Sequence, residues 1–213
     1  VRKDAVRGCD NGTCEMSTAK ALLHEMRRFV DLAGGAPVAA FLDGMDWAMD
    51  ERGLEPASLP CLAQLPRTTE LAERPAGALV RLLADGATRL RWGQTYTVAD
   101  FGRDFLDGYG WTEMFGTRGH FTNDRIAGGF LLLAPNLVYP DHHHTAEEIY
   151  IPLTGGAQWR MGEGGFAVRP AGAIIHHPSG VSHAMRTDDE PLLALYLWRG
   201  GALDQRSVIG RSN

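Results

Sequence analysis

Two short segments of the chain carry side chains that could bind a metal ion. The first, Asp-His-His-His-Thr-Ala-Glu-Glu-Ile-Tyr, begins at Asp141, and the second, Pro-Ser-Gly-Val-Ser-His, ends at His183. In a β-strand, side chains two residues apart point to the same face, so His142, His144 and Glu148 would converge. Two imidazoles and a carboxylate on one face form a metal site with open coordination positions. We expect His183 to supply a fourth ligand.

The other polar residues of these segments are expected to play different parts. Strand alternation turns His143 and Glu147 to the opposite face. Glu147 could replace Glu148 only if the strand slipped by one residue, which would turn the histidine ligands outward. His176 and His177 precede the second segment, and we expect neither to be a ligand. One of them could instead hydrogen-bond a ligand.

The composition excludes several functional classes. The chain has 213 residues, 22% of them charged and 44% hydrophobic, which is typical of one globular unit. A net charge of -5 indicates no general affinity for nucleic acid or anionic membranes. No apolar run approaches the roughly 20 residues of a membrane span. Cys9, Cys14 and Cys61 are expected to be unpaired thiols, a zinc site or disulfide being the alternative, and we expect a cytoplasmic protein.

The elements that must position these residues fall into two kinds. Apolar residues recur at helical spacing from a cap at Ser17 to residue 34, over residues 37–53, and over residues 76–84. Prolines mark residues 56–66 as a connecting loop. The first part of the chain therefore predicts a layer of three helices.

From about residue 90 the pattern changes to short strands separated by glycine turns. The candidate strands are residues 90–96, 128–133, 148–152, 157–161, 166–169, 173–176 and 192–198. Such spacing indicates a sandwich or barrel. We expect a mainly β protein in which a helical region, residues 1–89, packs on a β-barrel, residues 90–213, as one structural unit. The glycine-rich stretch 102–128 is either a lid over the site or a plain surface connection.

The metal-binding pattern resembles the two motifs of the cupin superfamily. From His142 the chain reads His-x-His-x-x-x-Glu-x-x-x-x-x-x-Gly, and the segment ending at His183 reads Gly-x5-Pro-x-Gly-x-x-His. The glycine usual before the first histidine is absent, and Thr187 stands where asparagine is often found. The resemblance implies a double-stranded, jelly-roll-like β-barrel that holds one divalent transition metal, Zn, Fe, Mn, Co or Ni. The ligands that it implies are His142, His144, Glu148 and His183.

Two tyrosines and a tryptophan narrow the resemblance to the cupin-type dimethylsulfoniopropionate (DMSP) lyases. Tyr139 lies shortly before the first histidine, Tyr150 follows Glu148 on the same face, and Trp198 lies on the last strong strand candidate. The family implies cleavage of DMSP to dimethyl sulfide and acrylate by β-elimination. A metal-bound carboxylate and a tyrosine base fit that chemistry. Tyr150 is the first choice for the base, with Tyr139 as the alternative or as a residue that orients the substrate.

The substrate implied is a small sulfonium carboxylate, and a related sulfonium or betaine acid is not excluded. Its sulfonium is a soft cation that suits an aromatic wall. Trp198 is the leading candidate for that wall, together with Tyr139 and Tyr96. Further candidates are Tyr109, Trp111 and Phe121, although core packing is favoured for these three and for Tyr96. A homodimer is a further expectation.

Two other functions fit the same metal pattern. One is another cupin enzyme, such as an iron-dependent dioxygenase, because three histidines and a glutamate can also activate oxygen on iron. The other is a non-catalytic cupin that binds a small molecule. The helical region carries Arg27 and Arg28 among many acidic residues, which argues against a DNA-binding sensor.

Overall fold

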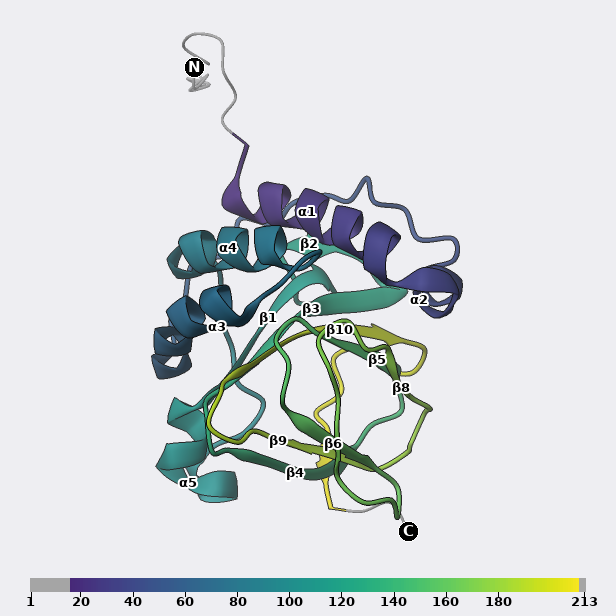
Figure 1. The fold of residues 1–213 in the computed structure, drawn as a ribbon. Helices are drawn as coiled ribbons and strands as arrows, with labels where there is room; N and C mark the ends of the chain where they lie inside the picture. Colours follow the sequence, from purple (N-terminus) through teal and green to yellow (C-terminus); the bar gives the residue numbers. More distant parts are fainter. Residues whose placement is uncertain (1–15, 211–213) are drawn as a thin grey trace, which may run out of the picture.

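The structure is a computed structural model that describes residues 16–210 (Figure 1). Its helices are α1 (Thr18–Ala33), α2 (Gly35–Phe41), η1 (Pro60–Gln64), α3 (Leu65–Leu71), α4 (Gly77–Gly86), η2 (Ala87–Arg89) and α5 (Val98–Asp107). The first strands are β1 (Tyr109–Gly116), β2 (Phe121–Thr122), β3 (Ile126–Leu133), β4 (Val138–His143), β5 (Glu147–Pro152) and β6 (Gln158–Met161). The remaining strands are β7 (Ala167–Val168), β8 (Ile175–His177), β9 (His183–Arg186), β10 (Leu192–Arg199) and β11 (Val208–Ile209).

The strands form two sheets that face each other as a barrel. The six-stranded sheet has the order β2-β1-β3-β10-β5-β8, and the five-stranded sheet has the order β11-β4-β9-β6-β7. All strand pairs are antiparallel except β1 with β2. With helices α1 to α4 on one side, this is the mainly β barrel with a helical layer that the sequence predicts.

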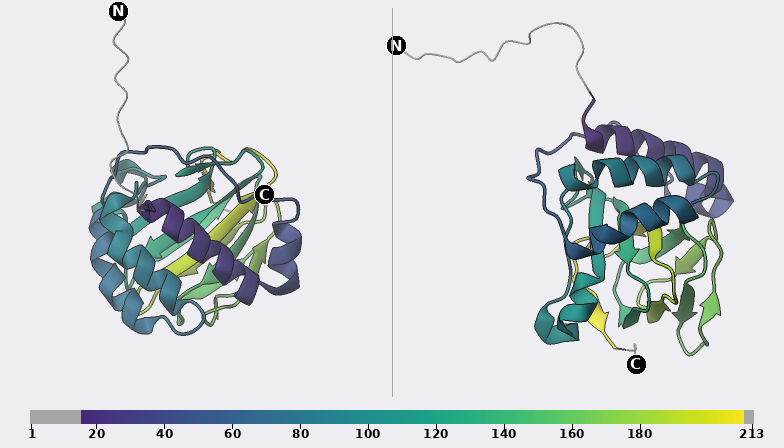
Figure 2. Two further views of the ribbon diagram at one scale, coloured as in Figure 1. Left: turned by 90° about the horizontal axis from the view of Figure 1, so that it is seen from above. Right: turned by 60° about the vertical axis from the view of Figure 1, so that its left-hand side comes forward.

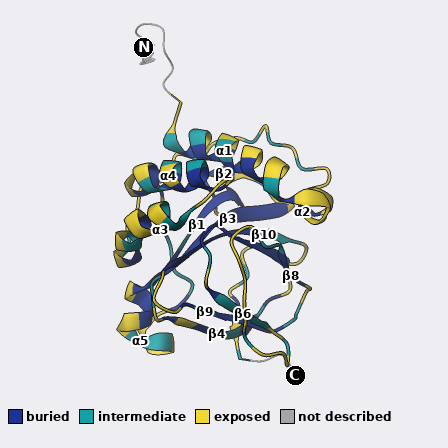
Figure 3. Ribbon diagram, in the orientation of Figure 1, coloured by how far each residue is buried: buried dark blue, intermediate teal, exposed yellow. Residues whose placement is uncertain are grey.

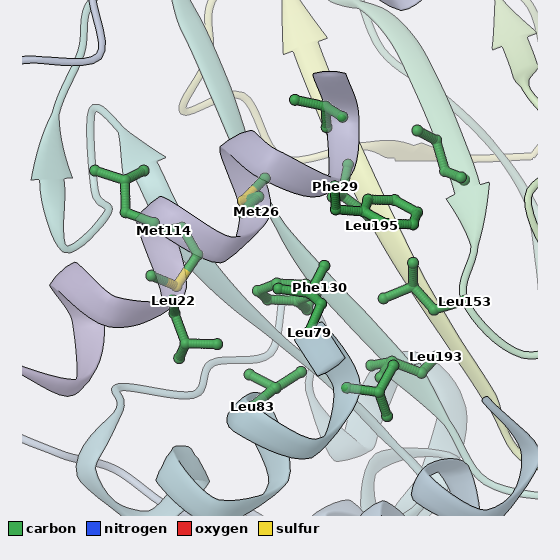
Figure 4. Close-up of a cluster of buried hydrophobic side chains, with 14 of the residues drawn as sticks. Leu22, Met26, Phe29, Leu79, Leu83, Met114, Phe130, Leu153, Leu193 and Leu195 are labelled. Atoms are coloured by element: carbon green, nitrogen blue, oxygen red, sulfur yellow. The ribbon is translucent and has the colours of Figure 1, made fainter. Parts of the chain in front are cut away.

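The helical layer covers the outer face of the six-stranded sheet, as seen from two further directions in Figure 2. All of β3 is buried, and so is β10 up to Leu197 (Figure 3). Apolar side chains of α1 and α4 pack against those of β3 and β10 (Figure 4). The labelled residues of this core include Leu22, Met26, Phe29, Leu79, Leu83, Phe130, Leu193 and Leu195. Burial of this apolar surface fixes the layer on the barrel.

The same sheet turns its alternate residues into the barrel. On β3, Leu131 and Leu133 belong to the interior cluster, whereas Phe130 packs under the helices. On β10, Tyr196 lines the interior and Leu195 faces the helices. Because both faces are covered, these strands read as continuous apolar runs rather than as alternating patterns.

The first and last predicted helices agree with α1 and α4, but the second is too long. Ser17 caps α1, its hydroxyl oxygen accepting from the Lys20 amide at 3.0 Å. The helix expected over residues 37–53 is α2, which ends at Phe41. The chain turns away at Gly44, which has a φ of 69°. The apolar spacing beyond that point instead serves packing against the core.

Three other expectations are wrong. Residues 90–96 form no regular strand and make only isolated bridges, such as Gly93 with Trp111. Residues 56–66 are not all loop, since η1 begins at Pro60. The stretch 102–128 is neither a lid nor a plain connection, because it contains the end of α5, all of β1 and β2 and the start of β3.

Within residues 16–210, no helix is both long enough and apolar enough to cross a membrane. Cys61 is a buried free cysteine whose pKa is raised to about 12 by burial. Cys9 and Cys14 lie outside the described residues. The boundary between residues 89 and 90 stays a prediction.

Candidate active site

Three ligand-type side chains meet inside the barrel. Nε2 of His144 and Nε2 of His183 each lie 3.1 Å from Oε2 of Glu148. All three residues are buried, and their ligand atoms lie within 4.8 Å of one another. Glu148 comes from β5 and His183 from β9, so the site joins the two sheets.

This group fits a divalent metal ion. Ligand atoms about 2.1 Å from a common ion and at right angles to each other are roughly 3.0 Å apart, close to the separations found here. Among residues 16–210, Nε2 of His183 is buried without a hydrogen-bond partner, so its lone pair is free for such an ion. The pKa of Glu148 is lowered: burial alone would raise it, but His144 and the other histidines more than offset that effect. The group could therefore hold a metal on two imidazoles and one carboxylate.

His142 lies beside this group without joining it. It is the cross-strand neighbour of His183, and the two ring centroids are 4.2 Å apart. Its ring stacks on that of Tyr139, with 4.2 Å between centroids, and Nδ1 lies 2.9 Å from the Pro140 carbonyl oxygen. Its role as a fourth ligand stays a prediction.

The spacing predicted that the candidate ligands share one strand, and the structure differs. His142 lies in β4, His144 lies in the connection that follows, and Glu148 belongs to β5. The alternation nevertheless separates the two faces. His143 points away, with Nδ1 3.3 Å from the Gly210 carbonyl oxygen.

Glu148 is also held through its other carboxylate oxygen. Nε1 of Trp198 donates to Oε1 of Glu148 at 2.5 Å, and the indole lies over the His144 ring, with 4.1 Å between centroids. The tryptophan that the sequence assigned to a substrate wall thus also orients a candidate ligand.

The two candidate bases are buried phenols. Burial, followed by the charge of Glu148, raises the pKa of Tyr150 well above its ordinary value. Burial and the neighbouring phenols likewise raise the pKa of Tyr139, whose hydroxyl lies 3.1 Å from that of Tyr96. Either phenol would lose its proton readily only beside a positive charge.

A pocket that is partly open to solvent leads to this site. The predicted site residues that line it are Tyr139, His142, Glu148, Tyr150 and Trp198. Tyr96 is not among the lining residues, but its hydroxyl is hydrogen-bonded to that of Tyr139. Tyr109 and Trp111, which the sequence offered as further wall candidates but favoured as core, also line it. The lining residues that the sequence did not single out for the site are Thr95, Glu113, Arg118, Leu131, Tyr196, Gln205 and Ser207, and of these only Tyr196 had a signal, the alternation of residues 192–198.

Glu113 and Arg118 form a charged pair in that pocket. Nη2 of Arg118 lies 3.3 Å from Oε2 of Glu113, and the Arg118 amide donates to Oε1 at 2.8 Å. Burial raises the pKa of Glu113, although Arg118 opposes the shift. These two residues belong to the part of the sequence that was expected to be a lid or a connection.

Comparisons with known proteins agree on one family. Residues 36–194 match the family model of the dimethylsulfoniopropionate lyases. The chain is 31% identical to the DMSP lyase DddQ of Ruegeria pomeroyi over 185 residues, 86% of this chain and 91% of that protein. It is 35% identical to the putative DMSP lyase DddL of Cereibacter sphaeroides over 148 residues, 68% of this chain and 61% of that protein.

Solved structures give the same result. A chain from the crystal structures of the DMSP lyases RdDddP and RnDddQII superposes with a TM-score of 0.82 at 28% identity, covering 92% of this chain and 100% of that one. The crystal structure of Ruegeria pomeroyi DddQ superposes with a TM-score of 0.80 at 28% identity, covering 91% and 98%. The fold, with its helical layer and its cupin-type barrel, is therefore shared along nearly the whole chain.

Proposed function

The chain belongs to the dimethylsulfoniopropionate lyase family and is a carbon–sulfur lyase, and we propose that it cleaves DMSP with a bound divalent metal and a tyrosine base. The observation that carries the details is that the Tyr150 phenol and the His144–Glu148–His183 group share one buried site. The metal is one of Zn, Fe, Mn, Co or Ni, all of which accept histidine and carboxylate ligands.

The reaction is a β-elimination. The base removes a proton from the carbon next to the carboxylate, the electron pair forms the carbon–carbon double bond, and the carbon–sulfur bond breaks. Acrylate and dimethyl sulfide are released, and the proton stays on the base. When bound, the metal supplies a positive charge for the substrate carboxylate, next to which negative charge develops. His144, Glu148 and His183 would hold it, with His142 as a further ligand.

Tyr150 is the proposed base. It follows Glu148 on the inward face of β5 and is buried in the same pocket. Without a cation its raised pKa keeps the phenol protonated at neutral pH, and a nearby divalent charge lowers that pKa. Tyr139 is the alternative base, or it orients the substrate through its contact with Tyr96.

The sulfonium group is proposed to lie against aromatic rings. Tyr139, Tyr196 and Trp198 line the pocket, and their faces attract a cation that offers no hydrogen-bond donors. A bare carboxylate would serve less well, because it would have to lose its hydration. Trp198 keeps its ring available for this contact while its N–H is bonded to Glu148.

The test is headspace gas chromatography after DMSP is added to protein reconstituted with each metal. We expect dimethyl sulfide from the parent protein, and a loss of at least about 100-fold in kcat for Tyr150→Phe because a general base is missing. Tyr139→Phe is compared directly. Full activity of Tyr150→Phe together with loss in Tyr139→Phe would move the base to Tyr139.

The ligand assignment has a matched pair of variants in adjacent residues. Glu148→Gln removes the buried carboxylate, whereas Glu147→Gln removes one that pairs on the outside with Arg199 and His176. Only the first should abolish activity. No dimethyl sulfide from the parent with any of the metals would rule out DMSP as the substrate. Oxygen uptake in its place would favour a dioxygenase.

A further inference from the structure

His177 is a buried histidine beside the candidate metal group that no motif assigns to it. It ends β8 and is the cross-strand neighbour of Glu148 on β5. The side chain is 1% exposed, and Nδ1 lies 3.6 Å from Oε2 of Glu148. Its ring is stacked on that of His183, with 4.0 Å between centroids and 17° between planes.

Neither ring nitrogen of His177 has a hydrogen-bond partner within the described part of the chain. A buried polar group left without a partner costs about 1–3 kcal/mol, so an apolar residue would be more stable at this position if packing were its only role. A movement of a few tenths of an ångström would bring Nδ1 within hydrogen-bond distance of Glu148. A hydrogen bond to Glu148 is therefore the role that the position of the His177 ring suggests.

The two residues that would then act on the Glu148 carboxylate lie in one row with it across the sheet. Trp198 on β10 and His177 on β8 are the two cross-strand neighbours of Glu148 on β5. Trp198 donates to Oε1, and His177 faces Oε2. The flanking strands therefore approach the carboxylate from both sides, which would fix its plane and the direction of its lone pairs.

The buried ring of His177 is placed to act as a donor, since Nδ1 faces Oε2 of Glu148. A neutral imidazole carries one N–H, which it can donate to Glu148 without placing a second positive charge beside a metal.

We propose that His177 is a positioning residue for the metal site. Its Nδ1–H donates to Oε2 of Glu148, and its ring fixes the plane of the His183 ligand by stacking. The inference rests on the proposed function in that Glu148 and His183 bind the metal. Loss of a group that orients a metal ligand typically weakens metal binding 10–100-fold.

The test measures zinc affinity by competition with a chromophoric chelator, without reference to turnover. His177→Phe keeps an aromatic ring against His183 but removes the N–H, whereas His177→Asn keeps an amide N–H close to the position of Nδ1. We expect the phenylalanine variant to bind zinc 10–100-fold more weakly and the asparagine variant to recover most of that loss. The matched control is His176→Phe on the same strand, since His176 is exposed and pairs with Glu147 at 2.7 Å.

Wild-type affinity in a folded His177→Phe protein would overturn the proposal, and so would equal losses in the phenylalanine and asparagine variants. A second measurement needs no variant: ¹⁵N-detected NMR of the imidazoles should show Nδ1 of His177 protonated, with the proton shifting when zinc binds. An unprotonated Nδ1 would refute the proposed donor. Failure of the wild type to bind zinc or the other divalent metals would instead remove the proposed metal function.

Discussion

Trp198 and Glu148 form a hydrogen bond across two neighbouring strands at the centre of the site. They are paired in register on β10 and β5, and the indole N–H meets Oε1 at 2.5 Å. Hydrogen bonds to an ionised carboxylate are among the stronger ones in proteins, and this carboxylate is fully buried. The residue that presents an aromatic face to the pocket thus also sets the orientation of a ligand.

Substitution of Trp198 by phenylalanine should weaken metal binding. The variant keeps a ring beside His144 but cannot donate to Glu148, so metal affinity should fall about 10–100-fold. Chelator competition measures the change. The control is Trp159→Phe: its buried N–H has no hydrogen-bond partner in the described residues, so its loss removes no such bond. Similar losses in the two variants would mean that the bond to Glu148 is unimportant.

Glu147 should make stability depend on pH. Its hydrogen bond to Arg199, opposed by a smaller burial effect and aided by His176, lowers its pKa in the folded protein. A lowered pKa stabilises the fold above the ordinary value of about 4.3, and this contribution is lost as the pH falls through the folded-state pKa. Because the pair is partly exposed, Glu147→Gln should cost only about 0.5–1 kcal/mol at neutral pH. Urea unfolding should show this difference near pH 7 and little of it near pH 3; an equal difference at both would be a contradiction.

Metal removal should lower thermal stability. A ligand present at 100 times its dissociation constant stabilises the native state by about 2.7 kcal/mol, which corresponds to roughly 5–10 °C in Tm for a chain of this size. Calorimetry before and after chelation measures the shift. Glu148→Gln provides the control, because its Tm should respond far less to added metal.

Gly129 should be irreplaceable for steric reasons. It lies opposite Glu113 in the pairing of β3 with β1, and a Cβ there would be 2.0 Å from the carbonyl oxygen of Thr112. The contact is with backbone, which cannot rotate aside, so Gly129→Ala should cost more than about 3 kcal/mol or prevent folding. Gly165→Ala, with open space around it, should change stability by no more than about 0.5 kcal/mol. Chemical denaturation compares the two.

Features that depend on neighbouring residues could be predicted from the sequence. Strand alternation correctly separated inward Glu148 from outward Glu147, because the period of two is a property of the backbone itself. It worked even though residues 142–150 span two strands and a turn, since the turn preserved the alternation. Ser17 and Gly34 marked the ends of α1 for an equally local reason, namely the needs of unpaired amide and carbonyl groups.

Contacts between residues that are distant in the sequence could not be predicted in this way. The contacts of Glu148 with Trp198 and His177 depend on the strand order β10-β5-β8, which no local spacing encodes. The Glu113–Arg118 pair was missed because β1 lacks a clear alternating pattern and is rich in buried residues on both faces. Likewise, the apolar spacing beyond Phe41 resembled a helix but belongs to a loop that packs on the core.

Strand β10 divides two tasks between neighbouring positions. Leu193, Leu195 and Leu197 anchor the outer layer, while Tyr196 and Trp198 shape the catalytic interior. An engineer could therefore tune robustness on one set and selectivity on the other with little direct interference. Insertion or deletion of a single amino acid in this strand would exchange the two sets and destroy both properties at once.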